Sequence, residues 1–262
     1  MVEPDSQAEV IRSLAGRLRR LERARPPVPV EDHCVSTGLA ALDAWLPGGG
    51  MTPGLVIEWL AADDGLGSTT LALSLMRQAL AAQGVAPVDV PQVEESEHSA
   101  DASEATETGR GRSDDRCGAL QAPVLVVVDS RGMFYAPEAV RLGIAVEHLL
   151  VVRPNAAEDV LWSWEQSLRS TGVVASVCWL ERISGLVYRR IKLAAETGGG
   201  IHHVIRPASH SRDPSWADLR LLVDAVQDTC GDRGRPFGSR TARVELVYGR
   251  GVGAGECFEC EI

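Results

Sequence analysis

The segment VLVVVD at positions 124–129 restricts the fold of this chain more than any other part of the sequence. Its five apolar residues follow one another without interruption, so a strand here has no side that suits water. Strands of this kind occur in parallel sheets whose two faces are both covered by helices. The segment therefore predicts an α/β fold with a mostly parallel central sheet flanked by helices.

The rest of the chain supplies the alternation of strands and helices that such a sheet requires. Short apolar runs are followed by stretches with apolar residues three and four positions apart, the spacing of one helix face. Strands are expected at 55–60, 149–152, 173–180 and 201–206, and helices at 69–82, 137–143, 157–169 and 186–197. Near the end, ARVELVYGRGVGAGECFECEI alternates as two antiparallel edge strands joined by a glycine-rich turn would.

An acidic insertion at about residues 88–122 accounts for most of the net charge, which is −10 over 262 residues. This segment holds nine acidic residues against three arginines and almost no large apolar side chains. Such a composition cannot bury enough surface to offset the entropy of ordering, so we expect a disordered insertion within a domain of residues 31–262. The acidic balance of the whole chain therefore does not exclude a nucleic-acid partner.

Residues 6–25 are predicted to form an amphipathic helix, which PPVPV at 26–30 ends and links to the domain. One face carries six arginines, and the other carries apolar residues at helical spacing. The apolar stripe is a candidate partner-binding surface, and packing on the chain's own core explains it equally well. It comprises Ile11, Leu14, Leu18 and Leu21.

The composition favours the cytoplasm. The sequence has no apolar stretch near the ~18 residues of a membrane span, and its first residues lack the basic and then apolar order of a secretion signal. Six scattered cysteines do not make a disulfide framework. We also expect no metal site, because Cys257 and Cys260 are a lone pair, and neighbouring His202 and His203 in a strand point to opposite faces.

The most specific motif is the stretch from 35 to 73, VSTGLAALDAWLPGGGMTPGLVIEWLAADDGLGSTTLAL. It resembles the entry to the RecA-type recombinase fold, in which an S-T-G…L-D…G-G-G…G-x-(apolar)-x-E segment leads through a strand into a phosphate-binding loop. The resemblance implies a RecA-like core. The matching residues, in order, are Ser36, Thr37, Gly38, Leu42, Asp43, Gly48, Gly49, Gly50, Gly54 and Glu58.

The phosphate-binding loop itself is degenerate. The pattern G-x-x-x-x-G-K-[ST] falls on ADDGLGST at 62–69, where only Gly67 and Thr69 fit. Ser68 stands where a lysine would reach the phosphates, and two aspartates at 63–64 add negative charge. ATP would therefore bind weakly, if at all, through the backbone N–H groups at the start of the following helix. That candidate cofactor site consists of Gly67, Ser68, Thr69 and Thr70.

Two further catalytic side chains of RecA-type ATPases are replaced in this chain. The resemblance places the glutamate that activates water two residues after Asp129, where this chain has Arg131. A guanidinium cannot act as a general base at neutral pH. The aspartate that helps to position Mg²⁺ falls on Leu180. With the lysine, three groups needed for phosphoryl transfer are lost, so we expect the fold without hydrolysis, and no enzyme.

Three segments carry a closer resemblance, to the ImuA family of RecA-related, SOS-inducible accessory proteins of error-prone translesion synthesis. The family implies partners: a Y-family-like polymerase homologue (ImuB), an error-prone polymerase III α-type subunit and, as a further candidate, RecA. The acidic insertion departs from the family pattern. The segments are STGLAALDAWLPGGG, APEAVRLGIAVEHLLVVRPNAAEDVLWSWEQSLRSTGVVASVCW and YRRIKLAAETGGGIHHVIRP.

Basic residues of the second half are candidates for DNA contact, although a solvated helix face explains several of them adequately. Two other functions stay open beside the accessory role. One is an ATP-dependent recombination mediator, and the other is a SulA-like inhibitor of cell division. The candidate DNA-binding residues are Arg189, Arg190, Lys192, Arg206 and Arg212.

Overall fold

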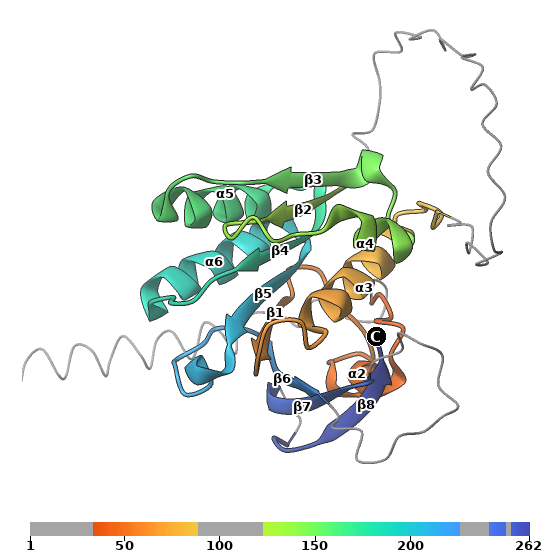
Figure 1. The fold of residues 1–262 in the computed structure, drawn as a ribbon, viewed down its shortest axis with the longest axis vertical. Coiled ribbons are helices and arrows are strands. Elements are labelled where there is room, and N and C mark those ends of the chain that lie inside the picture. Colours follow the sequence, from red (N-terminus) through yellow and green to blue (C-terminus); the bar gives the residue numbers. More distant parts are fainter. Residues whose placement is uncertain (1–33, 89–122, 226–240, 250–252) are drawn as a thin grey trace, which may run out of the picture. The chain divides into compact units, whose positions relative to one another are not determined.

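A mostly parallel sheet forms the centre of the computed structural model, which describes residues 34–88, 123–225, 241–249 and 253–262 (Figure 1). Its strands are β1 (Val56–Ala61), β2 (Val124–Val128), β3 (Leu149–Val152), β4 (Val173–Trp179), β5 (Ile201–Pro207), β6 (Leu219–Ala225), β7 (Thr241–Gly249) and β8 (Cys257–Glu261). They lie in the order β3-β2-β4-β5-β1-β6-β7-β8. The first six run parallel, β7 is antiparallel to β6, and β8 is antiparallel to β7.

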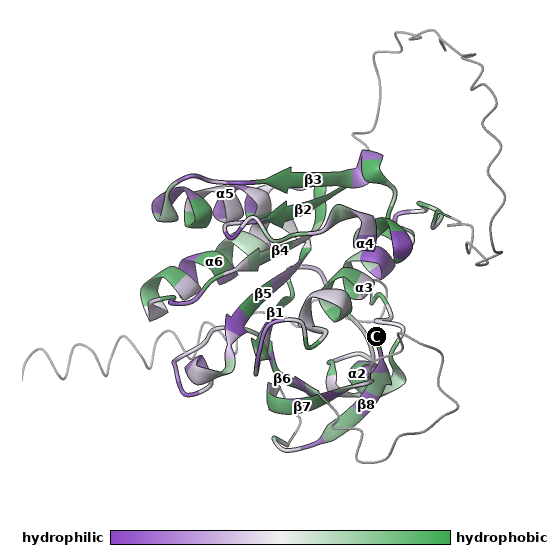
Figure 2. Cartoon of the chain, in the orientation of Figure 1, coloured by the Kyte–Doolittle hydropathy of each residue, from purple (hydrophilic) through white to green (hydrophobic). Residues whose placement is uncertain are grey.

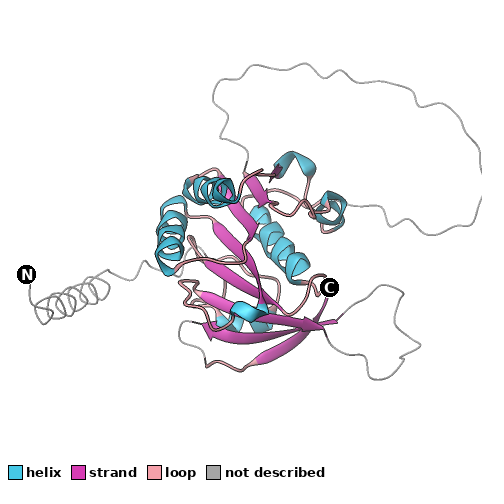
Figure 3. Ribbon diagram, turned by 60° about the vertical axis from the view of Figure 1, so that its left-hand side comes forward, coloured by secondary structure: helices cyan, strands magenta, loops and turns pink. Residues whose placement is uncertain are grey.

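Helices cover both faces of the sheet (Figure 3). They are α2 (Ala40–Trp45), α3 (Ser68–Ala81), α4 (Ala136–Arg141), α5 (Ala157–Arg169) and α6 (Gly185–Gly198), with 3-10 turns at Val146–His148 and Ala208–His210. One buried cluster joins α2, α3 and α4 to Ile57 and Trp59 of β1. A second joins α5 and α6 to Val56. Neighbouring residues of a strand point to opposite sides of the sheet. Val56 therefore lies in one cluster and Ile57 and Trp59 lie in the other, so both faces of β1 are buried.

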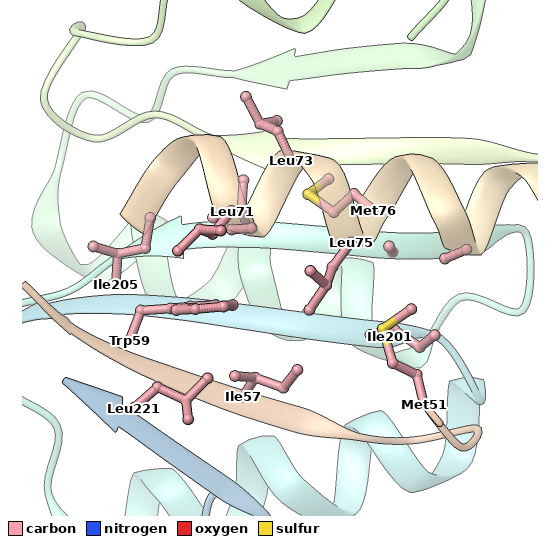
Figure 4. Packing of buried hydrophobic residues seen from close by; sticks show 14 of the residues in the cluster. Met51, Ile57, Trp59, Leu71, Leu73, Leu75, Met76, Ile201, Ile205 and Leu221 are labelled. Atoms are coloured by element: carbon pink, nitrogen blue, oxygen red, sulfur yellow. The ribbon is translucent and has the colours of Figure 1, made fainter. Parts of the chain in front are cut away.

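The larger cluster is formed where α3 lies along β1 and β5 (Figure 4). Leu71, Leu75 and Met76 of α3 pack with Trp59 and Ile201, and each of the five side chains is at most 5% exposed. Each large apolar side chain buried in this way contributes about 1.5–3 kcal/mol. Strands β2 and β3 are hydrophobic along their length (Figure 2), as the opening valine-rich segment predicts.

The predicted core elements are confirmed to within two residues at each end, and so is the antiparallel C-terminal pair. The predicted helix at 6–25 and most of the acidic insertion lie outside the described residues. Two elements were not predicted, the six-residue α2 and strand β6. Strand β6 was not predicted because Arg220 interrupts its run of apolar residues. This arginine is buried, and Glu58 of the adjacent β1 balances its charge.

Among the described helices, none combines the length and the apolar character that a bilayer span requires. The described part of the chain also contains no cluster of three or more His, Cys, Asp or Glu side chains that could hold a metal ion.

Two adjacent histidines in the middle of β5 are fully buried. The Nδ1 atom of His203 accepts a hydrogen bond from Trp59 Nε1 at 3.1 Å, and the Nδ1 atom of His202 lies 2.9 Å from Ser176 Oγ. Neither Nε2 atom has a hydrogen-bond partner within the described structure. The pKa of each imidazole is lowered to about 3, chiefly by burial, and for His202 the charges of His203 and Lys192 contribute to the lowering. Both rings are therefore neutral at pH 7.

These pKa values predict a loss of stability in acid. Below about pH 6.5 these imidazoles become protonated in the unfolded chain, whereas in the folded chain they stay neutral down to about pH 3. The free energy of unfolding should therefore fall with decreasing pH in this window, by up to about 1.4 kcal/mol per pH unit for each histidine. Urea unfolding at a series of pH values measures the slope. His203→Leu should reduce it, because the unfolded chain then takes up one proton fewer in this window. An unchanged slope in His203→Leu contradicts the assignment.

Candidate functional site

The carboxyl ends of the parallel strands open onto a cavity of about 600 Å³. The ends of β1, β2, β4 and β5 and the first turn of α5 contribute to its walls. Ligands of open parallel sheets bind at this edge, so the cavity and the loop between β1 and α3 form the candidate site. Its polar and aromatic lining includes Asp63, Asp64, Arg131, Trp179, Glu181 and Arg182.

The loop at 62–67 leads from β1 into α3, as a phosphate-binding loop would. Gly67 adopts φ of +96°, in the left-handed region that favours glycine. A Cβ atom built there would meet Cδ1 of Ile262, which is the end of a flexible side chain. The backbone angle of the turn therefore explains the glycine at this position.

The structure brings the four predicted cofactor residues together at the start of α3, where no side chain caps the helix. Ser68 is buried, and Thr69 and Thr70 are half-buried. None of the four lines the cavity. What this terminus offers an anion is its backbone N–H groups and helix dipole, without a cation from the loop.

Arg131, the residue that the RecA-type resemblance places where a general base was expected, is paired with the loop at 62–67. Arg131, which follows β2, donates to both carboxylate oxygens of Asp64, at 3.1 and 3.0 Å. The two side chains are 44% and 62% exposed. An ion pair this exposed contributes about 0.2–1 kcal/mol to stability. By the resemblance to RecA-type proteins, these two positions were expected to hold a general base and part of a phosphate-binding loop, and in the structure a guanidinium is bound to a carboxylate there.

Asp129, at the end of β2, holds the loop that carries Arg131. Its buried carboxylate accepts hydrogen bonds from the backbone N–H groups of Met133 and Phe134, at 3.0 and 3.2 Å. Arg153 donates to the same carboxylate at 3.1 Å. At the position expected for the Mg²⁺-positioning acid, the backbone N–H of Leu180 donates to Ile205 of β5. The carboxylate of the retained Asp129 is therefore engaged in hydrogen bonds and an ion pair within the fold.

Behind the cavity, Glu58 balances two buried arginines. Its carboxylate accepts from Arg206 Nη1 at 2.7 Å and from Arg220 Nε at 2.8 Å. Tyr188 and Ser215 donate hydroxyl hydrogen bonds to the same group, at 3.2 and 2.5 Å. Burial, and after it the charge of Glu58, raises the pKa of Tyr188 well above its usual range. This network joins β1, β5, β6 and α6, and the sequence motif that contains Glu58 did not reveal its arginine partners.

Five basic residues were predicted to contact DNA, and the structure does not gather them into one surface. Arg206 is buried and also pairs with Asp213, while Lys192 is buried and pairs with Asp218. The exposed three are Arg189, which lies over the ring of Trp216, Arg190, which pairs with Glu165, and Arg212. DNA contact stays a prediction, and the two buried members are engaged within the fold. The apolar stripe predicted at 11–21 lies outside the described residues.

No model of a known protein family matches the chain, and no curated protein matches it in sequence.

The Glu58 network predicts a large destabilisation by a nearly isosteric change. Glu58→Gln would leave two buried guanidinium groups without the carboxylate between them. Removing one partner of a buried ion pair costs about 3–5 kcal/mol, which urea unfolding at neutral pH would measure. The matched control is Asp64→Asn at the exposed pair, with an expected loss below about 1 kcal/mol. Equal losses in the two variants would contradict the role given to Glu58.

Proposed function

We propose that this chain is a RecA-like accessory protein that does not hydrolyse nucleotide and that acts through contacts with other proteins. The observation that carries the proposal is the Arg131–Asp64 pair, which occupies the positions of the general base and of the phosphate loop. Ser68 in place of lysine and Leu180 in place of the metal-positioning acid support it. A mostly parallel α/β fold is compatible with a RecA-like core.

The proposed pathway rests on the resemblance to the ImuA family on residues 36–50, 136–179 and 188–207. In that family, a RecA-related protein without efficient ATP hydrolysis serves SOS-induced, error-prone translesion synthesis. By this resemblance the partners would be a Y-family-like polymerase homologue and an error-prone polymerase III α-type subunit, with RecA as a further candidate. The protein would connect these partners instead of performing chemistry.

A binding experiment tests this assignment. The tagged full-length chain should retain the Y-family-like polymerase homologue of the same organism, with a Kd of micromolar or below. A chain that lacks residues 1–30 should bind more weakly if the stripe of Ile11, Leu14, Leu18 and Leu21 is the docking element. If the polymerase homologue is retained by neither form, the mutagenesis role is wrong.

An ATP-dependent recombination mediator is the second candidate, favoured by Gly67, Thr69 and the uncapped start of α3. In this reading the missing lysine comes from a neighbouring subunit. DNA-stimulated release of phosphate that Thr69→Ala abolishes would establish the mediator and exclude the non-catalytic account.

A further inference from the structure

We draw no further inference here: the strongest candidate, the exposed apolar side chains of Trp162, Leu186 and Leu193 on the outer side of α5 and α6, lies on helices that carry exposed charges of both signs, and nothing in the structure shows what covers it.

Discussion

Glu58 is a fully buried carboxylate in the middle of the sheet, and the arrangement of its neighbours depends on how its charge is balanced. Arg206 of β5 and Arg220 of β6 approach it from the two strands beside β1. A buried charge without partners would cost several kcal/mol, so these strands and the loop that carries Ser215 have little freedom around β1. Two of the four strands whose ends line the cavity, β1 and β5, belong to this network.

The pairing of opposite charges is also the main feature of the loop between β1 and α3, at the candidate site. A phosphate-binding loop concentrates positive charge and N–H groups to receive an anion. In this chain two arginines near the loop are already paired with carboxylates, since Arg131 binds Asp64 and Arg153 binds Asp129. Neither pair needs a bound phosphate to balance it.

Most of the fold could be predicted from apolar periodicity alone, because valine-rich runs such as β2 permit a single kind of environment. The exceptions were the short helix α2 and strand β6. In β6, Arg220 breaks the apolar run, and its partner Glu58 lies 162 positions away in the sequence. The loss of lysine at Ser68 was readable from the loop pattern. The pairing of Arg131 with Asp64 was not, because it depends on the ends of two strands that α3 and the insertion separate in the chain.

Equilibrium binding of MgATP, measured by calorimetry on the full-length protein, tests the central claim most directly. The account predicts no saturable heat at millimolar nucleotide, because the loop at 62–67 has neither lysine nor an unpaired cation to receive the phosphates. A saturating isotherm with a micromolar Kd that Thr69→Ala abolishes would contradict it. The site would then be a working nucleotide site, with its missing cation supplied from outside the residues considered to form it.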